Sequence, residues 1–215
     1  MIIAIDGPAG SGKSTTARLL ADKLDFIYLD TGAMYRAVTF YFLQNSVNFS
    51  DFDKVNKALS DINLSIHFNN QFEVYINGQN VNQNIRTSTV NDFVSNISKI
   101  DLVRKKMVEI QRTFSDNRDI VIEGRDIGSY VFPNAEFKFF LVADVYERAK
   151  RRLKQIKDDS SITIDQLVEK LNKRDEIDSS RSISPLIKAE DAIEIDTTSL
   201  SIDEQVIKIY NIVNK

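Results

Sequence analysis

Short apolar runs without alternation recur along the chain and predict buried strands. They are rich in Ile, Val, Phe and Leu, as is typical of strands covered on both faces. The five runs are residues 2–6, 26–29, 119–123, 137–143 and 192–195. Segments with helical spacing lie at 14–24, 147–156 and 163–174. This alternation of strand and helix predicts an α/β fold with a parallel sheet.

One segment departs from this rhythm and predicts a small antiparallel insert. Apolar and polar residues alternate over 64–68 and 72–76, with a turn at residues 69 and 70 between them. Asn77-Gly78 is typical of a type I′ hairpin turn, and residues 79–82 can supply a third short strand. The pattern leaves open whether the insert takes part in binding or is a solvent-side hairpin with no role.

Composition narrows the class of protein. A chain of 215 residues suits one compact domain, and a formal net charge of -3 gives no global basic surface for a nucleic-acid polymer. The absence of cysteine excludes thiolate chemistry and fits a reducing compartment. The N-terminal residues show no signal-peptide pattern, and the apolar runs are too short to cross a bilayer. We therefore expect a cytoplasmic protein with no nucleic-acid or membrane partner.

The segment after the first predicted strand matches G-x-x-x-x-G-K-[ST]. It reads Gly7, Pro8, Ala9, Gly10, Ser11, Gly12, Lys13, Ser14, and Thr15 follows. Glycines let backbone N–H groups approach phosphate oxygens, and a helix starting near Gly12 points its free N–H groups at the same anion. Lys13 can reach the β- and γ-phosphates, and the Ser14 hydroxyl can ligate Mg²⁺. The alternative is an ordinary Gly-rich strand-to-helix turn, which the apolar run before the motif and the amphipathic segment after it disfavour.

Two further motifs follow predicted strands at the carboxyl edge of the sheet, where ligands bind. After the second strand, Thr31 and Gly32 can offer a hydroxyl and N–H groups to an acceptor phosphate, and Arg36 adds a cation. Alternatively, Thr31 caps its own helix. After the third strand, Arg125 can bind phosphate and Asp126 an amine or hydroxyl. Alternatively, the two form a surface ion pair in a turn.

Charged residues recur at helical spacing in two later segments. Arg148, Arg151 and Arg152 lie at i, i+3 and i+4. Arg174, Asp178 and Arg181 lie at i, i+4 and i+7, and Pro185 is placed to end that helix. Each set can neutralise a transferring phosphoryl group under a closing lid that excludes water. Each can equally be a solvated face or a set of internal ion pairs.

Together these motifs resemble those of the bacterial cytidylate kinases over essentially the whole chain. The matching strings are IDGPAGSGKST at 5–15, LDTGAMYRA at 29–37, NIRT at 84–87, IEGRDIG at 122–128, ERAKRR at 147–152 and KRDEIDSSR at 173–181. The resemblance implies a P-loop kinase core with a five-stranded parallel sheet flanked by helices, a small antiparallel β insert on the acceptor side and a helical lid. It implies one nucleoside monophosphate kinase domain over 1–215, with core 1–62, 88–146 and 162–215, insert about 63–87 and lid about 147–161.

The resemblance also implies roles for individual residues. The catalytic set is Lys13, Arg125, Arg148 and Arg152, and residues 7–15 bind the ATP phosphates. The CMP-binding set is Thr31, Tyr35, Arg36, Ser95, Arg104, Gly124, Arg125, Asp126, Arg174, Asp178 and Arg181. Ser14 ligates Mg²⁺ together with waters and phosphates. Ser95 and Arg104 rest on the resemblance alone, since their spacing does not single them out.

The reaction that the resemblance implies is Mg²⁺-dependent, in-line transfer of the γ-phosphoryl group from ATP to CMP or dCMP. The products are ADP and CDP or dCDP, and the protein is expected to be a monomer. A kinase for another small acceptor, such as UMP, AMP, TMP or shikimate, would carry the same phosphate loop. A nucleotide-binding switch and a non-catalytic binding module are two further alternatives.

Overall fold

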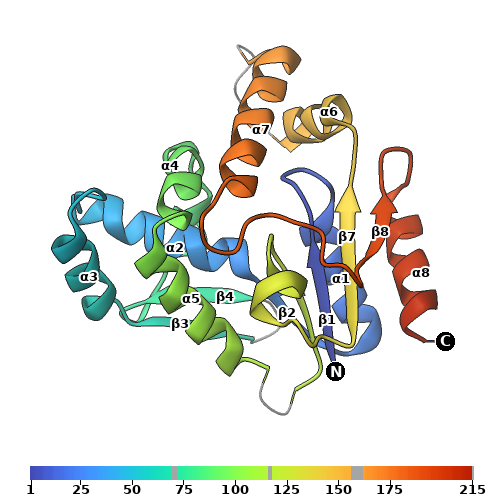
Figure 1. The fold of residues 1–215 in the computed structure, drawn as a ribbon, viewed down its shortest axis with the longest axis horizontal. Coiled ribbons are helices and arrows are strands. Elements are labelled where there is room, and N and C mark those ends of the chain that lie inside the picture. Colours follow the sequence, from blue (N-terminus) through green and yellow to red (C-terminus); the bar gives the residue numbers. More distant parts are fainter. Residues whose placement is uncertain (69–71, 116–117, 156–161, 215) are drawn as a thin grey trace. The chain divides into compact units, whose positions relative to one another are not determined.

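The computed structural model describes residues 1–68, 72–115, 118–155 and 162–214 (Figure 1). The chain forms two compact units: Met1–Tyr28 with Asn117–Lys215, and Leu29–Asp116. In the described part of the chain, no helix is both long and apolar enough to span a membrane.

A five-stranded sheet organises the first unit, and the chain passes into the second unit within its strand β2. Its strands are β1 (Ile2–Asp6), β2 (Ile27–Asp30), β6 (Ile120–Glu123), β7 (Phe137–Val142) and β8 (Ile193–Asp196), in the order β2-β6-β1-β7-β8. Strand β1 is central and pairs in parallel with β6 and β7, and β7 pairs in parallel with β8. The α/β prediction and the five-stranded parallel sheet are confirmed. The carboxyl ends of β1 and β6 lie side by side, since Ile5 aligns with Glu123.

Helices α1 (Lys13–Leu24) and α8 (Ile202–Val213) pack against this sheet and against each other. In α1 the apolar residues Ala17, Leu20 and Ala21 share one face, and all three are fully buried. They join Ile3 and Phe139 of the strands in one apolar cluster. Burying a side chain such as Ile or Leu stabilises the fold by about 1.5–3 kcal/mol, so this cluster holds the middle of α1 against the sheet.

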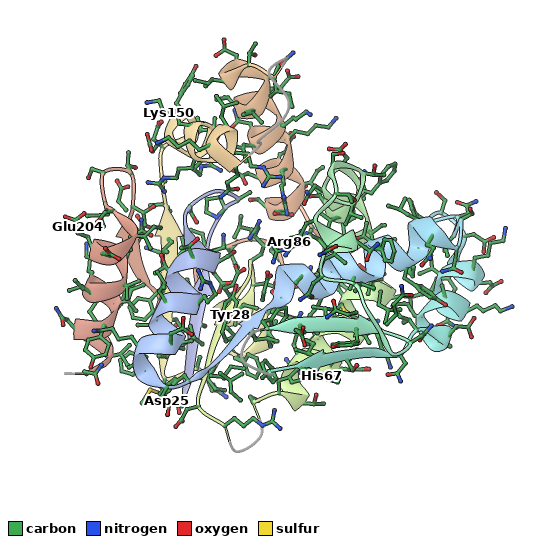
Figure 2. The ribbon with its side chains drawn as sticks, turned by 180° about the vertical axis from the view of Figure 1, so that it is seen from behind. Asp25, Tyr28, His67, Arg86, Lys150 and Glu204 are labelled. Atoms are coloured by element: carbon green, nitrogen blue, oxygen red, sulfur yellow. The ribbon has the colours of Figure 1, made fainter. Side chains whose placement is uncertain are left out.

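Helices α6 (Val145–Gln155) and α7 (Ile164–Ser179) pack on each other (Figure 1). Ala149 of α6 and Leu167 and Leu171 of α7 enclose Ala9 of the phosphate loop in a second apolar cluster. The lid expected over 147–161 includes residues 156–161, which lie outside the described residues. Where α6 is described, its outer face is polar, and Lys150 is exposed there (Figure 2).

The second unit combines helices with a small antiparallel sheet. Its elements are α2 (Thr31–Gln44), α3 (Phe52–Asp61), β3 (Leu64–His67), β4 (Glu73–Ile76), β5 (Gln79–Asn80), the short 3₁₀ helix η1 (Asn84–Arg86), α4 (Ser88–Ser98) and α5 (Asp101–Thr113). Strands β3, β4 and β5 pair antiparallel in that order. Asn77 and Gly78 both have positive φ, 49° and 81°, as a type I′ turn requires. The expected insert therefore contains the predicted three strands, while the turn predicted at residues 69 and 70 lies outside the described residues.

His67 lies on β3 of this small sheet (Figure 2). Its ring stacks on that of Tyr75 with the centroids 4.5 Å apart. The histidine is exposed and belongs to the cross-strand packing of β3 and β4.

Candidate functional site

The phosphate loop connects β1 to α1 in a backbone shape that requires glycine. Gly7 has φ 142°, and a Cβ on it would lie 2.1 Å from the carbonyl oxygen of Leu141. Gly12 has φ 96° and precedes α1, and no described side chain caps the start of that helix. The first N–H groups of α1 are therefore left to an external acceptor, which makes the loop an anion-binding site.

Lys13 is buried at the first position of α1. It is 4% exposed, and its Nζ donates to the carbonyl oxygen of Pro8 at 2.7 Å. Burial lowers the pKa of the Lys13 ammonium to about 7, and the positive charge of Arg125 acts in the same direction. An anionic phosphate next to the ammonium favours its charged form, so ligand binding and protonation of Lys13 support each other.

Ser14 directs its hydroxyl at an acidic residue that the sequence interpretation did not assign. Its Oγ donates to Oε1 of Glu123 at 2.6 Å. Glu123 is the last residue of β6, directly beside β1, and it is buried. An apolar run that ends in a carboxylate is a signal that could have identified it. Hydroxyl and carboxylate oxygens are ligand atoms that suit Mg²⁺, so Ser14 and Glu123 fit the metal that the sequence predicts.

The rest of a metal coordination sphere would have to come from the substrate and from water. Among the residues that the structure describes, no group of three or more His, Cys, Asp or Glu side chains could hold a metal ion. This agrees with P-loop enzymes in general, in which triphosphate oxygens complete the sphere.

Arg148 of α6 contacts the phosphate loop directly. The guanidinium is buried, and Nη1 donates to the carbonyl oxygen of Ala9 at 3.1 Å and to Oδ2 of Asp175 at 2.6 Å. The N–H of Ala9 in turn donates to Oδ1 of Asp175 at 3.5 Å. The alternative of a solvated arginine face is wrong for Arg148, because the loop and α7 cover it. Asp175 is a second residue that the sequence interpretation missed.

The other two arginines of α6 have different partners. Arg151 donates to the main-chain carbonyl oxygens of Thr197 and Thr198, after β8. Arg152 donates to Oε1 of Gln155 at 3.2 Å, within α6 itself. Arg148 is thus held against the phosphate loop.

A buried carboxylate joins two of the predicted arginines. Oδ2 of Asp178 accepts from Nε of Arg125 at 2.8 Å, and Oδ1 accepts from Nη2 of Arg181. The Asp178 side chain is 2% exposed, and burial would raise its pKa, yet Arg125 and Arg181 hold that pKa below its usual value. Arg174 on α7 is close enough to lower the pKa of both Asp178 and Lys13.

These contacts correct two details of the sequence interpretation. Arg125 pairs with Asp178, and not with Asp126 in a surface ion pair, and Asp126 is buried. Helix α7 ends at Ser179, so Arg181 lies beyond it and not on a helix running toward Pro185. Serine side chains compete for backbone hydrogen bonds and so favour helix ends, and Ser179 and Ser180 stand at this one.

The strand end that carries Arg125 and Asp126 is attached to β1. The N–H of Gly124 donates to the carbonyl oxygen of Ile5 at 3.0 Å. A π-helical turn, η2 (Ile127–Val131), follows Asp126. The first unit thus gathers Lys13, Ser14, Gly124, Arg125, Asp126, Arg148, Arg174, Asp178 and Arg181 around the carboxyl ends of β1 and β6 and the neighbouring helices.

The remaining predicted residues lie in the second unit. Asp30, and not Thr31, caps α2: its Oδ1 accepts from the N–H of Ala33 at 2.7 Å. The cap alternative for Thr31 is therefore wrong, and Thr31 is a buried residue of the first turn. Arg36 donates from Nη2 to Oδ2 of Asp30 at 3.0 Å. The one carboxylate thus orders both the start of α2 and the arginine on it.

Arg104 and Tyr35 meet inside the second unit. The guanidinium carbon of Arg104 lies 5.4 Å from the centroid of the Tyr35 ring, and Nη1 donates to the carbonyl oxygen of Ser98 at 3.2 Å. Arg104 is 1% exposed. A buried cation is costly unless it is partnered, so its place on α5 requires such contacts. Ser95, on α4, is also buried, and its carbonyl accepts from the Ser98 hydroxyl.

The sequence profile described as cytidylate kinase matches residues 3–215. The chain belongs to the cytidylate kinase family. A cytidylate kinase of Fusobacterium nucleatum is 46% identical over 216 residues, covering 100% of this chain and 96% of the relative. A cytidylate kinase of Bacillus subtilis is 47% identical, covering 99% of this chain and 96% of the relative. Family membership makes the protein a P-loop kinase, a phosphotransferase.

Solved structures agree with the fold. A shikimate kinase of Bacteroides thetaiotaomicron superposes with a TM-score of 0.50 and 12% identity, covering 100% of this chain and 99% of that one. At that identity the likeness concerns the fold alone, and it lends no support to shikimate as the acceptor.

Proposed function

We propose that the protein transfers the γ-phosphoryl group of ATP to CMP, and similarly to dCMP, giving ADP and CDP or dCDP. The observation that carries this proposal is the family match over residues 3–215, in a chain that keeps the glycine-dependent phosphate loop with Lys13 at its helix end.

The chain's own residues would act by positioning and by neutralising charge. An oxygen of the CMP phosphate attacks the γ-phosphorus in line, and the bond to the β,γ-bridging oxygen breaks as ADP leaves. Lys13 and the N–H groups at the start of α1 would hold the donor phosphates. Arg125, Arg148 and Arg152 would stabilise the charge on the transferring group. A general base is not required, because the second pKa of a phosphate monoester is about 6.

For the acceptor, we propose that CMP binds to the residues for which the sequence predicts this role. They are Thr31, Tyr35, Arg36, Ser95, Arg104, Gly124, Arg125, Asp126, Arg174, Asp178 and Arg181. The supporting observations are the buried Asp178 with its two arginines and the buried Arg104 against Tyr35.

The proposed reaction also requires a bound Mg²⁺ ion. Ser14 would ligate the ion and Glu123 would hold its coordinated water, since their oxygen atoms are hydrogen-bonded to each other in the described structure. A bound magnesium ion neutralises charge on the β- and γ-phosphates. The monomeric state and the cytoplasmic location remain predictions of the sequence.

One assay tests the acceptor. ADP release is followed by a coupled reaction at fixed MgATP with CMP, dCMP, UMP, AMP, TMP and shikimate offered in turn. We expect CMP and dCMP to give the highest kcat/KM. If CMP were no better than AMP, the assignment would be wrong. Slow ATP hydrolysis at a rate independent of CMP would indicate a nucleotide-binding switch. No turnover with any acceptor would indicate a non-catalytic binding module.

A further inference from the structure

The proposed reaction assigns no role to the carboxylate of Asp6. This carboxylate nevertheless links the strand that enters the phosphate loop to the turn that follows Asp126. Asp6 ends β1, immediately before the phosphate loop, and is 5% exposed. Its Oδ1 accepts the N–H of Ile127 at 2.9 Å, and its Oδ2 accepts the N–H of Gly128 at 2.8 Å. These two residues begin η2, directly after Arg125 and Asp126.

The start of η2 depends on Asp6 because the preceding residue does not cap it. The first N–H groups of a helical turn have no partner inside the turn, and leaving one of them buried and unpaired is destabilising. Asp126 stands at the N-cap position, and its side chain makes no capping hydrogen bond. Its carbonyl oxygen accepts from the N–H groups of Tyr130 and Val131. A neighbouring strand therefore supplies the cap through Asp6.

The bonds to β1 flank the two proposed acceptor residues. On one side, the N–H of Gly124 donates to the main-chain oxygen of Ile5. On the other, the N–H of Ile127 donates to Asp6. Arg125 and Asp126 are the residues between these two bonds, so both ends of their backbone segment are anchored to β1.

The outer side of the turn is packed as well. A Cβ on Gly128 would lie 3.1 Å from both Cγ and Cδ of Lys138. The Nζ of Lys138 is itself held by Oδ2 of Asp191 at 2.7 Å. The turn is thus hydrogen-bonded by Asp6 and bounded by the Lys138 side chain.

We propose that Asp6 is a positioning residue for acceptor binding, fixing the backbone of Arg125 and Asp126 relative to the strand that enters the phosphate loop. This rests on the proposed function, in which both residues bind CMP. Two N–H donors need two acceptors, and a carboxylate has them. An asparagine has the same size but presents an NH₂ group to one of the N–H groups, so one donor loses its partner.

The test compares the wild type with Asp6→Asn at about pH 8, above the pKa of about 7 to which burial raises the Asp6 carboxyl. KM and kcat for CMP, the Kd of ATP and the amide proton shifts of Ile127 and Gly128 are measured. We expect the Asn variant to raise KM for CMP about 10- to 100-fold, because a misplacement of about 1 Å has effects of that size. The negative charge of Asp6 also raises the pKa of Lys13, so the Kd of ATP should rise as well, but by a smaller factor than KM for CMP.

Ile3→Val is the matched control. Ile3 is fully buried in the same strand and belongs to the apolar cluster with α1, so the variant weakens β1 without altering the bonds to η2. It should lower the melting temperature and leave KM for CMP unchanged. An equal rise of KM in Ile3→Val would overturn the proposal, since general destabilisation would then explain the effect.

Gly128→Ala is a second variant, for use if Asp6→Asn does not fold. It displaces the same turn and leaves the Asp6 side chain in place. It should also raise KM for CMP selectively. In either variant, shifted amide signals of residues 127 and 128 with unchanged KM for CMP would overturn the positioning role. So would an equal loss of ATP and CMP binding. A wild type with no CMP turnover would instead overturn the proposed function, while the amide shifts still report whether Asp6 holds the turn.

Discussion

The first turn of the phosphate loop makes two physical demands on residue 7, and the substitution Gly7→Ala violates both. The first demand is conformational, since Gly7 has φ 142°. The second is steric, since the added Cβ would lie 2.1 Å from the carbonyl oxygen of Leu141. That oxygen belongs to the main chain of β7, which is paired with β1 on one side and β8 on the other, so it cannot rotate away as a side chain would.

The variant Gly78→Ala serves as a comparison, because it carries the conformational cost of an added Cβ without the steric cost. Gly78 has φ 81°, and a Cβ there would meet nothing within 4 Å. A left-handed conformation costs an L-residue about 1–2 kcal/mol, which is the whole expected loss at Gly78. Overpacking adds about 1–3 kcal/mol, so Gly7→Ala should lose about 2–5 kcal/mol of the free energy of unfolding.

Urea unfolding followed by circular dichroism measures both variants against the wild type, and titration calorimetry measures ATP binding. We expect ATP affinity to fall at least tenfold in Gly7→Ala, because the loop must move to relieve the contact, and to be unchanged in Gly78→Ala. Equal unfolding free energies for the two variants would refute the steric reasoning. Normal ATP affinity in a destabilised Gly7→Ala would refute the link between this turn and the phosphates.

Two further predictions concern charged groups. Lys13→Ala should lower turnover by orders of magnitude and leave CMP affinity largely intact. The control is Lys23→Ala, on the same helix and stacked over a tyrosine ring, which should retain full turnover. An unchanged rate in Lys13→Ala would remove the phosphate loop from the mechanism. Since Arg125 and Arg181 hold the pKa of Asp178 below 3.8, the stability that Asp178 contributes is present above that pH and lost as the pH falls through its lower folded pKa. Asp178→Asn should therefore cost about 3–5 kcal/mol near neutral pH and progressively less as the pH falls below 3.8, as urea unfolding at each pH would measure; a cost independent of pH would contradict the pairing.

Local patterns were enough to predict the elements that form the sheet and the hairpins. The apolar run at the start of the chain predicted β1 at its observed bounds, because a strand buried on both faces tolerates few polar residues. Asn77-Gly78 predicted its turn, because a type I′ turn needs two residues that adopt positive φ. The ends of the later helices were less well predicted, since Arg181 fits the spacing of α7 but lies outside it.

The sequence by itself determined the phosphate loop, since its glycines, lysine and serine are contiguous and their chemistry depends on local backbone shape. Tertiary structure alone decided which carboxylates face that loop. Glu123 reaches Ser14 because β6 pairs with β1, and Asp175 reaches Ala9 and Arg148 because α7 packs on α6. Asp6 caps a turn 121 residues away. Such contacts join segments far apart in the chain, so a local pattern can mark a carboxylate such as Glu123 but not its partner, and the contacts form only when the sheet and its helices pack together.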